Sequence, residues 1–329
     1  MIVKRKLKTR ICLVLVLLLA FAGISAAAEE TDEKELTARQ ALDAYAAQDY
    51  ETTLSYLTQL ADAGDPEAQC LAAAFYFCGL GAEQDYGKAA EYYQLAADQG
   101  YVEGQLNLGW MYDAGVGVEQ DYEKAAEYYK LAADQGNAQA QNNLGWMYDF
   151  GIGVEQDYEK AAEYYRLAAD QGEPAAQTNL GLLYEYGDGV PQSYEKAAEY
   201  YQLAADQNYA HGQACLAQLY EFGDGVEQSD EMALKYYRLA ADQGDAMGQW
   251  GMGKAYQFGV GVDVDYEKAA AYYQLSADQE DPDGLECLAY LYLEGLGVEQ
   301  STEKAIALYH LAAERGSEEA QMQLMMLGQ

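Results

Sequence analysis

The chain has 329 residues, and its 55 Asp and Glu against 19 Lys and Arg give a formal net charge of −36. A field of this sign repels nucleic acid and anionic membrane surfaces, so we expect neither as a partner. The acidity favours cationic partners, or it serves only to keep the protein soluble, and the sequence leaves both interpretations open.

The first 28 residues have the layout of a secretory signal peptide. A basic start at residues 4–10 precedes an apolar run at 11–24 and small residues at 26–28. The run of about 14 residues is shorter than the roughly 20 that span a bilayer, although an uncleaved membrane anchor is the alternative. We therefore expect cleavage between Ala28 and Glu29, a secreted or periplasmic protein, and no membrane insertion after cleavage.

A short segment that begins at Asp85 (Asp-Tyr-Gly-Lys-Ala-Ala-Glu-Tyr-Tyr) recurs every 36 residues. Its copies begin at Asp121, Asp157, Ser193, Ser229, Asp265 and Ser301, and a worn copy begins at Asp49. A fixed period in this range is typical of a stack of small units, none of which can bury its apolar face alone. The period therefore predicts a repeat architecture with an extended binding surface.

The segment from Ala138 to Glu173 illustrates one unit. Its first half predicts a helix that ends at Gly151, with a packing face of Ala140, Leu144, Met147 and Tyr148. After a glycine-containing turn, Asp157 is placed to cap a second helix that runs to Gln171. The packing stripe predicted for this second helix comprises Ala161, Tyr164, Tyr165, Ala168 and Ala169.

The repeated pattern Ala-x-x-x-Leu-Gly-x-x-Tyr-x-x-Gly-x-Gly-Val-x-x-Asp-x-x-Lys-Ala-x-x-Tyr-Tyr-x-x-Ala-Ala resembles the Sel-1-like repeat, a relative of the tetratricopeptide repeat. The resemblance covers seven units, which begin at Pro66, Val102, Ala138, Pro174, Ala210, Ala246 and Pro282. Asn208 and Glu280 depart from it, because they replace the glycine that ends the second helix elsewhere. The resemblance implies an all-α, right-handed superhelical solenoid of antiparallel helix pairs.

The repeat frame also predicts how the chain is organised. We expect a signal peptide at 1–28, N-terminal capping helices at 29–65, seven repeats at 66–317 and a C-terminal capping helix at 318–329. The ends of a solenoid need such polar caps. We expect the protein to be a monomer.

In the related tetratricopeptide fold the first helix lines a concave face, and the resemblance implies the same here. Four positions of this helix vary between units and form a candidate groove. Side-chain amides can hold an extended peptide backbone, aromatic rings can act as anchors, and carboxylates can attract Lys or Arg. The amides are Asn107, Asn143 and Asn179; the aromatic residues are Trp110, Trp146, Phe150, Tyr186 and Phe222; the carboxylates are Asp113, Asp149, Glu185 and Glu221.

This groove predicts a non-catalytic scaffold that binds a partner protein or peptide with a basic or extended segment outside the cytoplasm. Three alternatives stay open at this point. The similar units could have inherited these residues by recent duplication without using them. The chain could be a structural cell-surface spacer. It could also bind or hydrolyse β-lactams, an activity linked to cysteine-rich relatives of this repeat.

The signals for catalysis and metal binding have structural explanations. Ser193 with Lys196, and Ser301 with Lys304, match the Ser-x-x-Lys spacing of penicillin-recognising enzymes, but both serines stand at the helix-cap position. His211 is far from the only other histidine, and no Cys and His set has zinc spacing. We expect no enzyme activity, no cofactor and no metal. The repeat spacing also predicts free thiols at Cys70, Cys78, Cys215 and Cys287.

Overall fold

The computed structural model describes residues 33–328, so the predicted signal peptide lies outside the described residues. The described chain holds seventeen helices and no strand, and it divides into two compact units at Asp157. The helices of the first unit are α2 Glu33–Ala46, α3 Tyr50–Asp62, α4 Pro66–Cys78, α5 Tyr86–Asp98, α6 Val102–Ala114, α7 Tyr122–Asp134 and α8 Ala138–Phe150.

The second compact unit continues the same alternation of helices. Its helices are α9 Tyr158–Ala169, α10 Pro174–Tyr186, α11 Tyr194–Asp206, α12 Ala210–Phe222, α13 Asp230–Asp242, α14 Ala246–Phe258, α15 Tyr266–Ala277, α16 Pro282–Glu294, α17 Thr302–Glu314 and α18 Glu318–Met326. Between residues 33 and 328, no helix has both the length and the apolar character needed to cross a membrane.

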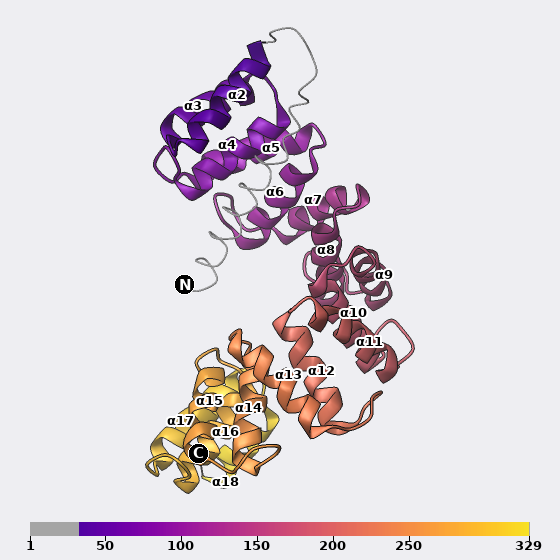
Figure 1. The fold of residues 1–329 in the computed structure, drawn as a ribbon, viewed down its shortest axis with the longest axis vertical. Helices are drawn as coiled ribbons and strands as arrows, with labels where there is room; N and C mark the ends of the chain where they lie inside the picture. The colour runs from indigo at the N-terminus through magenta and orange to yellow at the C-terminus, as the bar shows by residue number, and fades with distance from the viewer. Residues whose placement is uncertain (1–32, 329) are drawn as a thin grey trace. The chain divides into compact units, whose positions relative to one another are not determined.

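Helices that follow one another in the sequence pack side by side within each compact unit (Figure 1). The two helices of a repeat make the most extensive contacts, for example α10 with α11 and α12 with α13. The first helix of one repeat also contacts the first helix of the next, as α10 contacts α12. This arrangement confirms the predicted all-α stack of helix pairs.

The helix ends follow the chemistry expected from the repeat. The first helix, α8, begins at Ala138 and ends at Phe150, followed by Gly151 at φ +66°. In the second helices the residue before the first turn accepts a hydrogen bond from a backbone amide: Asp121 accepts from Lys124 N at 3.0 Å. The helix α9 ends at Ala169, two residues earlier than predicted. At this end Gln171 N donates to Ala168 O, three residues back, in place of the α-helical bond to the residue four positions back.

Glycines at three repeat positions have positive φ angles, and the position after the second helix tolerates another residue. A Cβ on the turn glycine Gly117 would lie 2.2 Å from Tyr86 O of the preceding repeat. Around Gly244, which follows a second helix, nothing lies within 4 Å of the added Cβ. Asn208 and Glu280 occupy this open position with φ angles of 60° and 62°. The departures from the repeat pattern therefore fall where only backbone strain, and not a clash, opposes them.

In repeats with the Leu-Gly pair or its Met-Gly equivalent, a buried tyrosine of the second helix packs against the glycine in the first helix, as at Gly109, Gly181 and Gly253. A Cβ on Gly181 would lie 2.5 Å from the Tyr201 ring, so the absence of a side chain makes room for the ring. Four of these tyrosines are among the largest fully buried side chains: Tyr129, Tyr165, Tyr201 and Tyr273. The predicted stripe of α9 is confirmed at four positions and extends to Ala162, whereas Tyr164 is only half-buried.

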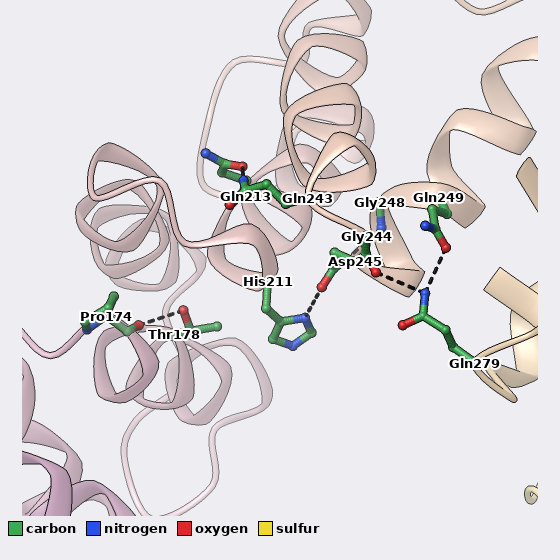
Figure 2. A network of polar contacts seen from close by, with 10 residues as sticks. All are labelled: Pro174, Thr178, His211, Gln213, Gln243, Gly244, Asp245, Gly248, Gln249 and Gln279. Carbon is green, nitrogen blue, oxygen red and sulfur yellow. Dashed lines mark hydrogen bonds and ion pairs between the residues drawn. The ribbon is translucent and has the colours of Figure 1, made fainter. Parts of the chain in front are cut away.

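Pairs of glutamines join the two helices of a repeat and connect them to the preceding repeat. In the second compact unit, Gln243 Nε2 donates to Gln213 Oε1 and Gln279 Nε2 donates to Gln249 Oε1, each at 2.8 Å (Figure 2). The buried member also donates to a backbone carbonyl of the preceding second helix, as Gln213 does to Ala205 O at 3.4 Å. These side chains satisfy helix-end carbonyls inside the stack, where an unpaired carbonyl would cost stability.

The first tyrosine of the Tyr-Tyr pair forms a second repeated cluster at the helix surface. Tyr112 and Tyr128 stack with ring centroids 5.8 Å apart, and Lys124 Nζ lies 5.1 Å from the centroid of the Tyr112 ring. Tyr184 and Tyr200 stack in the same way at 5.7 Å. These in-phase contacts assign the tyrosines to packing, as the sequence predicts.

Candidate functional site

The predicted groove residues lie on the first helices, at four positions of the repeat. The asparagine position precedes the Leu-Gly pair, the carboxylate position is the last but one residue of the helix, and the aromatic position is the last. The tryptophans lie between them. The candidates belong to α6, α8, α10 and α12.

The carboxylate position binds the buried tyrosine of the same repeat. Tyr201 Oη donates to Glu185 Oε2 at 2.7 Å, and Tyr237 Oη donates to Glu221 Oε2 at 2.8 Å. In the next repeat Tyr273 Oη donates to Gln257 Oε1 at 2.6 Å, so an amide oxygen serves as well as a carboxylate. Residues at this position therefore share one role, which is to accept a hydrogen bond from a buried tyrosine hydroxyl.

Burial changes the acidity of these carboxyl groups. Burial raises the pKa of Asp113, and a hydrogen bond from Tyr129 opposes that rise. The pKa of Glu185 is raised mainly by burial and further by the nearby charge of Asp224, while the Tyr201 hydroxyl lowers it. These carboxylates are more costly to ionise than free surface carboxylates.

The asparagine position reaches the same tyrosine from the following repeat. Asn143 hydrogen-bonds to the hydroxyl of Tyr129, which also bonds to Asp113. Cys287 stands at this position in the last repeat and contacts the Tyr273 hydroxyl. Asn107 instead donates to Glu103 O of its own helix at 2.7 Å. Asn179 is half-buried. The carboxylate position and, at Asn143, the asparagine position therefore help to hold a buried tyrosine, a contact that the sequence analysis missed.

The two tryptophans differ in their surroundings. The Trp110 ring is half-buried and meets the Phe77 ring edge-on, with centroids 5.7 Å apart. Trp146 is 37% exposed, and its ring lies 5.3 Å from that of Phe150, which is 60% exposed. Trp146 and Phe150 thus form an exposed aromatic pair on α8.

The second compact unit exposes three aromatic rings at successive copies of the aromatic position. Their exposed fractions are 66% for Tyr186, 56% for Phe222 and 64% for Phe258. The helices that carry them are neighbours, because α10 contacts α12 and α12 contacts α14. We call these three residues the aromatic row.

A lysine that no sequence signal pointed to lies beside the aromatic row. Lys254 Nζ is 2.6 Å from Glu221 Oε1, 4.4 Å from the centroid of the Trp250 ring and 5.5 Å from that of the Phe222 ring. Lys254 stands at the repeat position of Trp110 and Trp146, so it replaces an aromatic ring by a cation. Its ion pair neutralises Glu221 but not Glu185 of the preceding repeat.

His211 forms a polar contact between two first helices of the second compact unit. Its Nδ1 lies 3.4 Å from Asp245 Oδ2 (Figure 2). Hydrogen bonds with Asp245 and with Cys215 raise the pKa of His211 above its usual range. This contact joins α12 to the N-cap residue of α14, and the Cys215 thiol beside it is buried.

The two Ser-x-x-Lys matches are helix caps. Ser193 Oγ accepts from Lys196 N, and Ser301 Oγ accepts from Lys304 N, each at 3.3 Å. The Nζ of Lys196 lies 4.8 Å from the centroid of the Tyr184 ring, in a cation–π contact. Among residues 33–328 there is no group of three or more His, Cys, Asp or Glu that could hold a metal ion, and the four cysteines there are free.

Comparisons with known proteins agree with this geometry. The family model described as Sel1 repeat matches residues 66–101, 102–137, 138–173, 174–209, 210–245, 246–281 and 288–317. A search of curated proteins gave no match.

Two solved structures carry the same repeat. The protein c5321 of uropathogenic Escherichia coli strains, a protective antigen with an SLR fold, is 35% identical with a TM-score of 0.60. That match covers 83% of this chain and 67% of the other. A Sel1 repeat protein from Oxalobacter formigenes is 29% identical with a TM-score of 0.69, over 75% of this chain and 97% of the other. With seven matched repeats, alternating helix pairs and these two relatives, the chain belongs to the Sel1 repeat family, whose members are generally scaffolds for protein–protein interaction.

Proposed function

We propose that this protein is a non-catalytic scaffold outside the cytoplasm, and that the exposed side of its first helices captures a partner protein or peptide. The aromatic rings at the ends of these helices are the observation that carries the proposal. A ring that is more than half exposed adds little to the core, and a row of such rings is typical of a binding surface.

The candidate residues have different roles in this proposal. The carboxylate position and Asn143 hold buried tyrosines, and the remaining hydrogen-bonding capacity of the asparagines faces the partner, because one amide offers two donors and an acceptor. The aromatic residues supply the anchors. The net charge of −36 draws in a basic segment over a range of about one Debye length, roughly 10 Å at 0.1 M salt.

A second row of exposed apolar residues provides a control for the location of the binding surface. Leucines at a single position of the second helices are also exposed, by 48% for Leu203, 37% for Leu239 and 49% for Leu275. These residues provide a matched control, since they have the same 36-residue period and belong to the second helices α11, α13 and α15.

The experiment compares capture of proteins by the full chain and by two triple variants. One carries Tyr186→Ala, Phe222→Ala and Phe258→Ala; the other carries Leu203→Ala, Leu239→Ala and Leu275→Ala. We expect partners identified by quantitative mass spectrometry to be lost with the first variant and kept with the second. Equal capture by wild type and both variants would favour the spacer interpretation, and selective loss with the leucine variant would move the binding surface to the second helices.

The location is proposed from residues 1–28, which have the layout of a secretory signal peptide. N-terminal sequencing of the protein from the cell exterior or periplasm should begin near Glu29. Recovery of the intact N-terminus in the cytoplasmic fraction would contradict this location, without bearing on the binding surface.

A further inference from the structure

The aromatic row lies on three neighbouring first helices at one repeat position. Packed helices lie about 8–10 Å apart, so successive rings are expected to recur at about that distance. Three rings of this size offer an apolar surface on the order of 300 Å², which is large enough to mark an interaction site.

The recurrence distance selects among the regular conformations that a bound peptide can adopt. A polyproline II helix has three residues per turn and a rise of about 3.1 Å, so it repeats the same face about every 9 Å. A β-strand repeats a face about every 6.6 Å and an α-helix repeats a turn every 5.4 Å, and neither matches. Polyproline II segments also bind aromatic surfaces in other domains, because their prolines are apolar and already ordered.

The charge beside the row is unusual within this chain. In the turns after α10 and α12, Asp188 and Asp224 occupy a position that is Leu80, Val116, Ile152, Val260 or Leu296 in the other repeats. Asp224 is close enough to Glu185 to affect its ionisation. Within residues 33–328 neither Asp188 nor Asp224 forms an ion pair, and Lys254 is already paired with Glu221 at 2.6 Å.

The carboxylates of Glu185, Asp188 and Asp224 therefore form a negative region at the Tyr186 end of the row. Asp188 lies near Tyr186, since its charge acts on that phenol. A basic side chain bound here would contact both a carboxylate and an aromatic ring. The planar guanidinium of Arg suits both contacts. The negative region follows from the positions of these carboxylates and the ring spacing is expected from helix packing, and both fit the same ligand.

We propose that the aromatic row and the Asp188 and Asp224 carboxylates bind a basic, proline-rich segment in the polyproline II conformation. This inference rests on the proposed scaffold function and specifies its partner class. Prolines at every third position contact Tyr186, Phe222 and Phe258, and Arg side chains between them pair with the two aspartates. The occupant is a segment of a partner protein, not a folded domain.

Fluorescence anisotropy with synthetic peptides tests the proposal on the full chain. The probe is a labelled peptide of four Pro-Pro-Arg triplets, which spans about 37 Å and so reaches all three helices. A peptide of four Gly-Ser-Arg triplets has the same charge but is flexible, and one of four Pro-Pro-Glu triplets has the opposite charge. We expect the first peptide to bind about tenfold more tightly than the flexible one, and the acidic one not to bind.

Variants separate the two parts of the surface. Phe222→Ala should weaken binding of the Pro-Pro-Arg peptide about tenfold. Asp188→Val with Asp224→Val places the residue of Val116 and Val260 at the two turns, so it should keep the fold and weaken the salt dependence of binding. Leu203→Ala, an exposed leucine of α11, should leave the affinity unchanged, and circular dichroism confirms that each variant is folded.

Three outcomes would overturn the inference: equal binding of the proline-rich and flexible peptides, unchanged affinity in Phe222→Ala, or unchanged salt dependence in the double Asp variant. None of them removes the proposed scaffold function, which the capture experiment tests with whole partner proteins. If capture depends on the aromatic triple variant while the peptide fails, the surface binds a partner of another class.

Discussion

The constant and the varying positions of the repeat do different work, although they share the same helices. Constant residues contact another helix: the turn glycines meet the preceding repeat, the Leu-Gly glycine meets a tyrosine ring, and the buried glutamines donate to a carbonyl of the preceding second helix. Varying residues at the end of the first helix are exposed, as Tyr186 and Phe258 are. The comparison indicates that residues which fit closely against another helix are constant, whereas the exposed last residue of the first helix varies.

The largest effect is expected at a constant glycine. Gly189→Ala would place a Cβ 2.3 Å from the Tyr158 backbone at a φ of +65°, so both a clash and backbone strain oppose it. We expect a loss of about 3 kcal/mol or more in the free energy of unfolding, measured by urea denaturation.

Gly244→Ala is the matched control, because its φ is +85° but nothing lies within 4 Å of the added Cβ. It should cost only about 1 kcal/mol, the strain alone. Similar losses at the two glycines would show that contact between repeats does not separate constant from varying positions.

An intermediate effect is expected at the glutamine pairs. Gln213→Ala removes hydrogen bonds to Ala205 O and from Gln243, and it should cost about 1–2 kcal/mol. Gln218→Ala, on the same helix, changes a side chain with no hydrogen bond to the other described residues, and it should cost less than about 0.5 kcal/mol. Urea denaturation measures both losses of stability. A larger loss for Gln218→Ala than for Gln213→Ala would contradict the structural role assigned to Gln213.

A smaller, pH-dependent effect is expected at the carboxylate position. Because the pKa of Glu185 is raised in the folded state, the folded protein holds its proton more tightly than the unfolded chain. The charged carboxylate therefore costs stability at neutral pH, and this cost disappears as the pH falls through the raised pKa toward the ordinary value.

Glu185→Gln should then stabilise the protein at pH 7 and have no such effect near pH 4. The variant keeps an acceptor for Tyr201, as Gln257 does for Tyr273 at 2.6 Å. Glu199→Gln, on the exposed face of α11, controls for the loss of one negative charge. Melting temperatures at both pH values measure the effect, and a gain that is the same at both would mean that burial of the charge is not its cause.

The fold could be predicted from the sequence because the same pattern recurs in every repeat. The helix α8 ends just before Gly151, and Asp121 caps α7 at the repeat position where the sequence predicts a cap. The candidate site could be predicted only in part. The exposed rings of Phe150, Tyr186 and Phe222 were expected from their place on the first helix. The bond between Glu185 and Tyr201 was missed because it joins two helices across a turn, so no single-helix pattern reveals it. Lys254 was missed because its partners, Glu221 and Phe222, belong to another repeat.

The smallest effect on stability is expected at the aromatic row. Phe222 is 56% exposed, so Phe222→Ala removes little buried surface and should change the free energy of unfolding by less than about 0.5 kcal/mol. The ring's contact with Lys254, whose Nζ lies 5.5 Å from the ring centroid, is partly solvated, and the Lys254–Glu221 ion pair remains without it. Urea denaturation of Phe222→Ala and Leu203→Ala should therefore give nearly equal stabilities, while only the former loses affinity for the Pro-Pro-Arg peptide. A loss above about 1 kcal/mol in the free energy of unfolding of Phe222→Ala would instead show that the ring packs within the stack of helices, as the residues at the constant positions do.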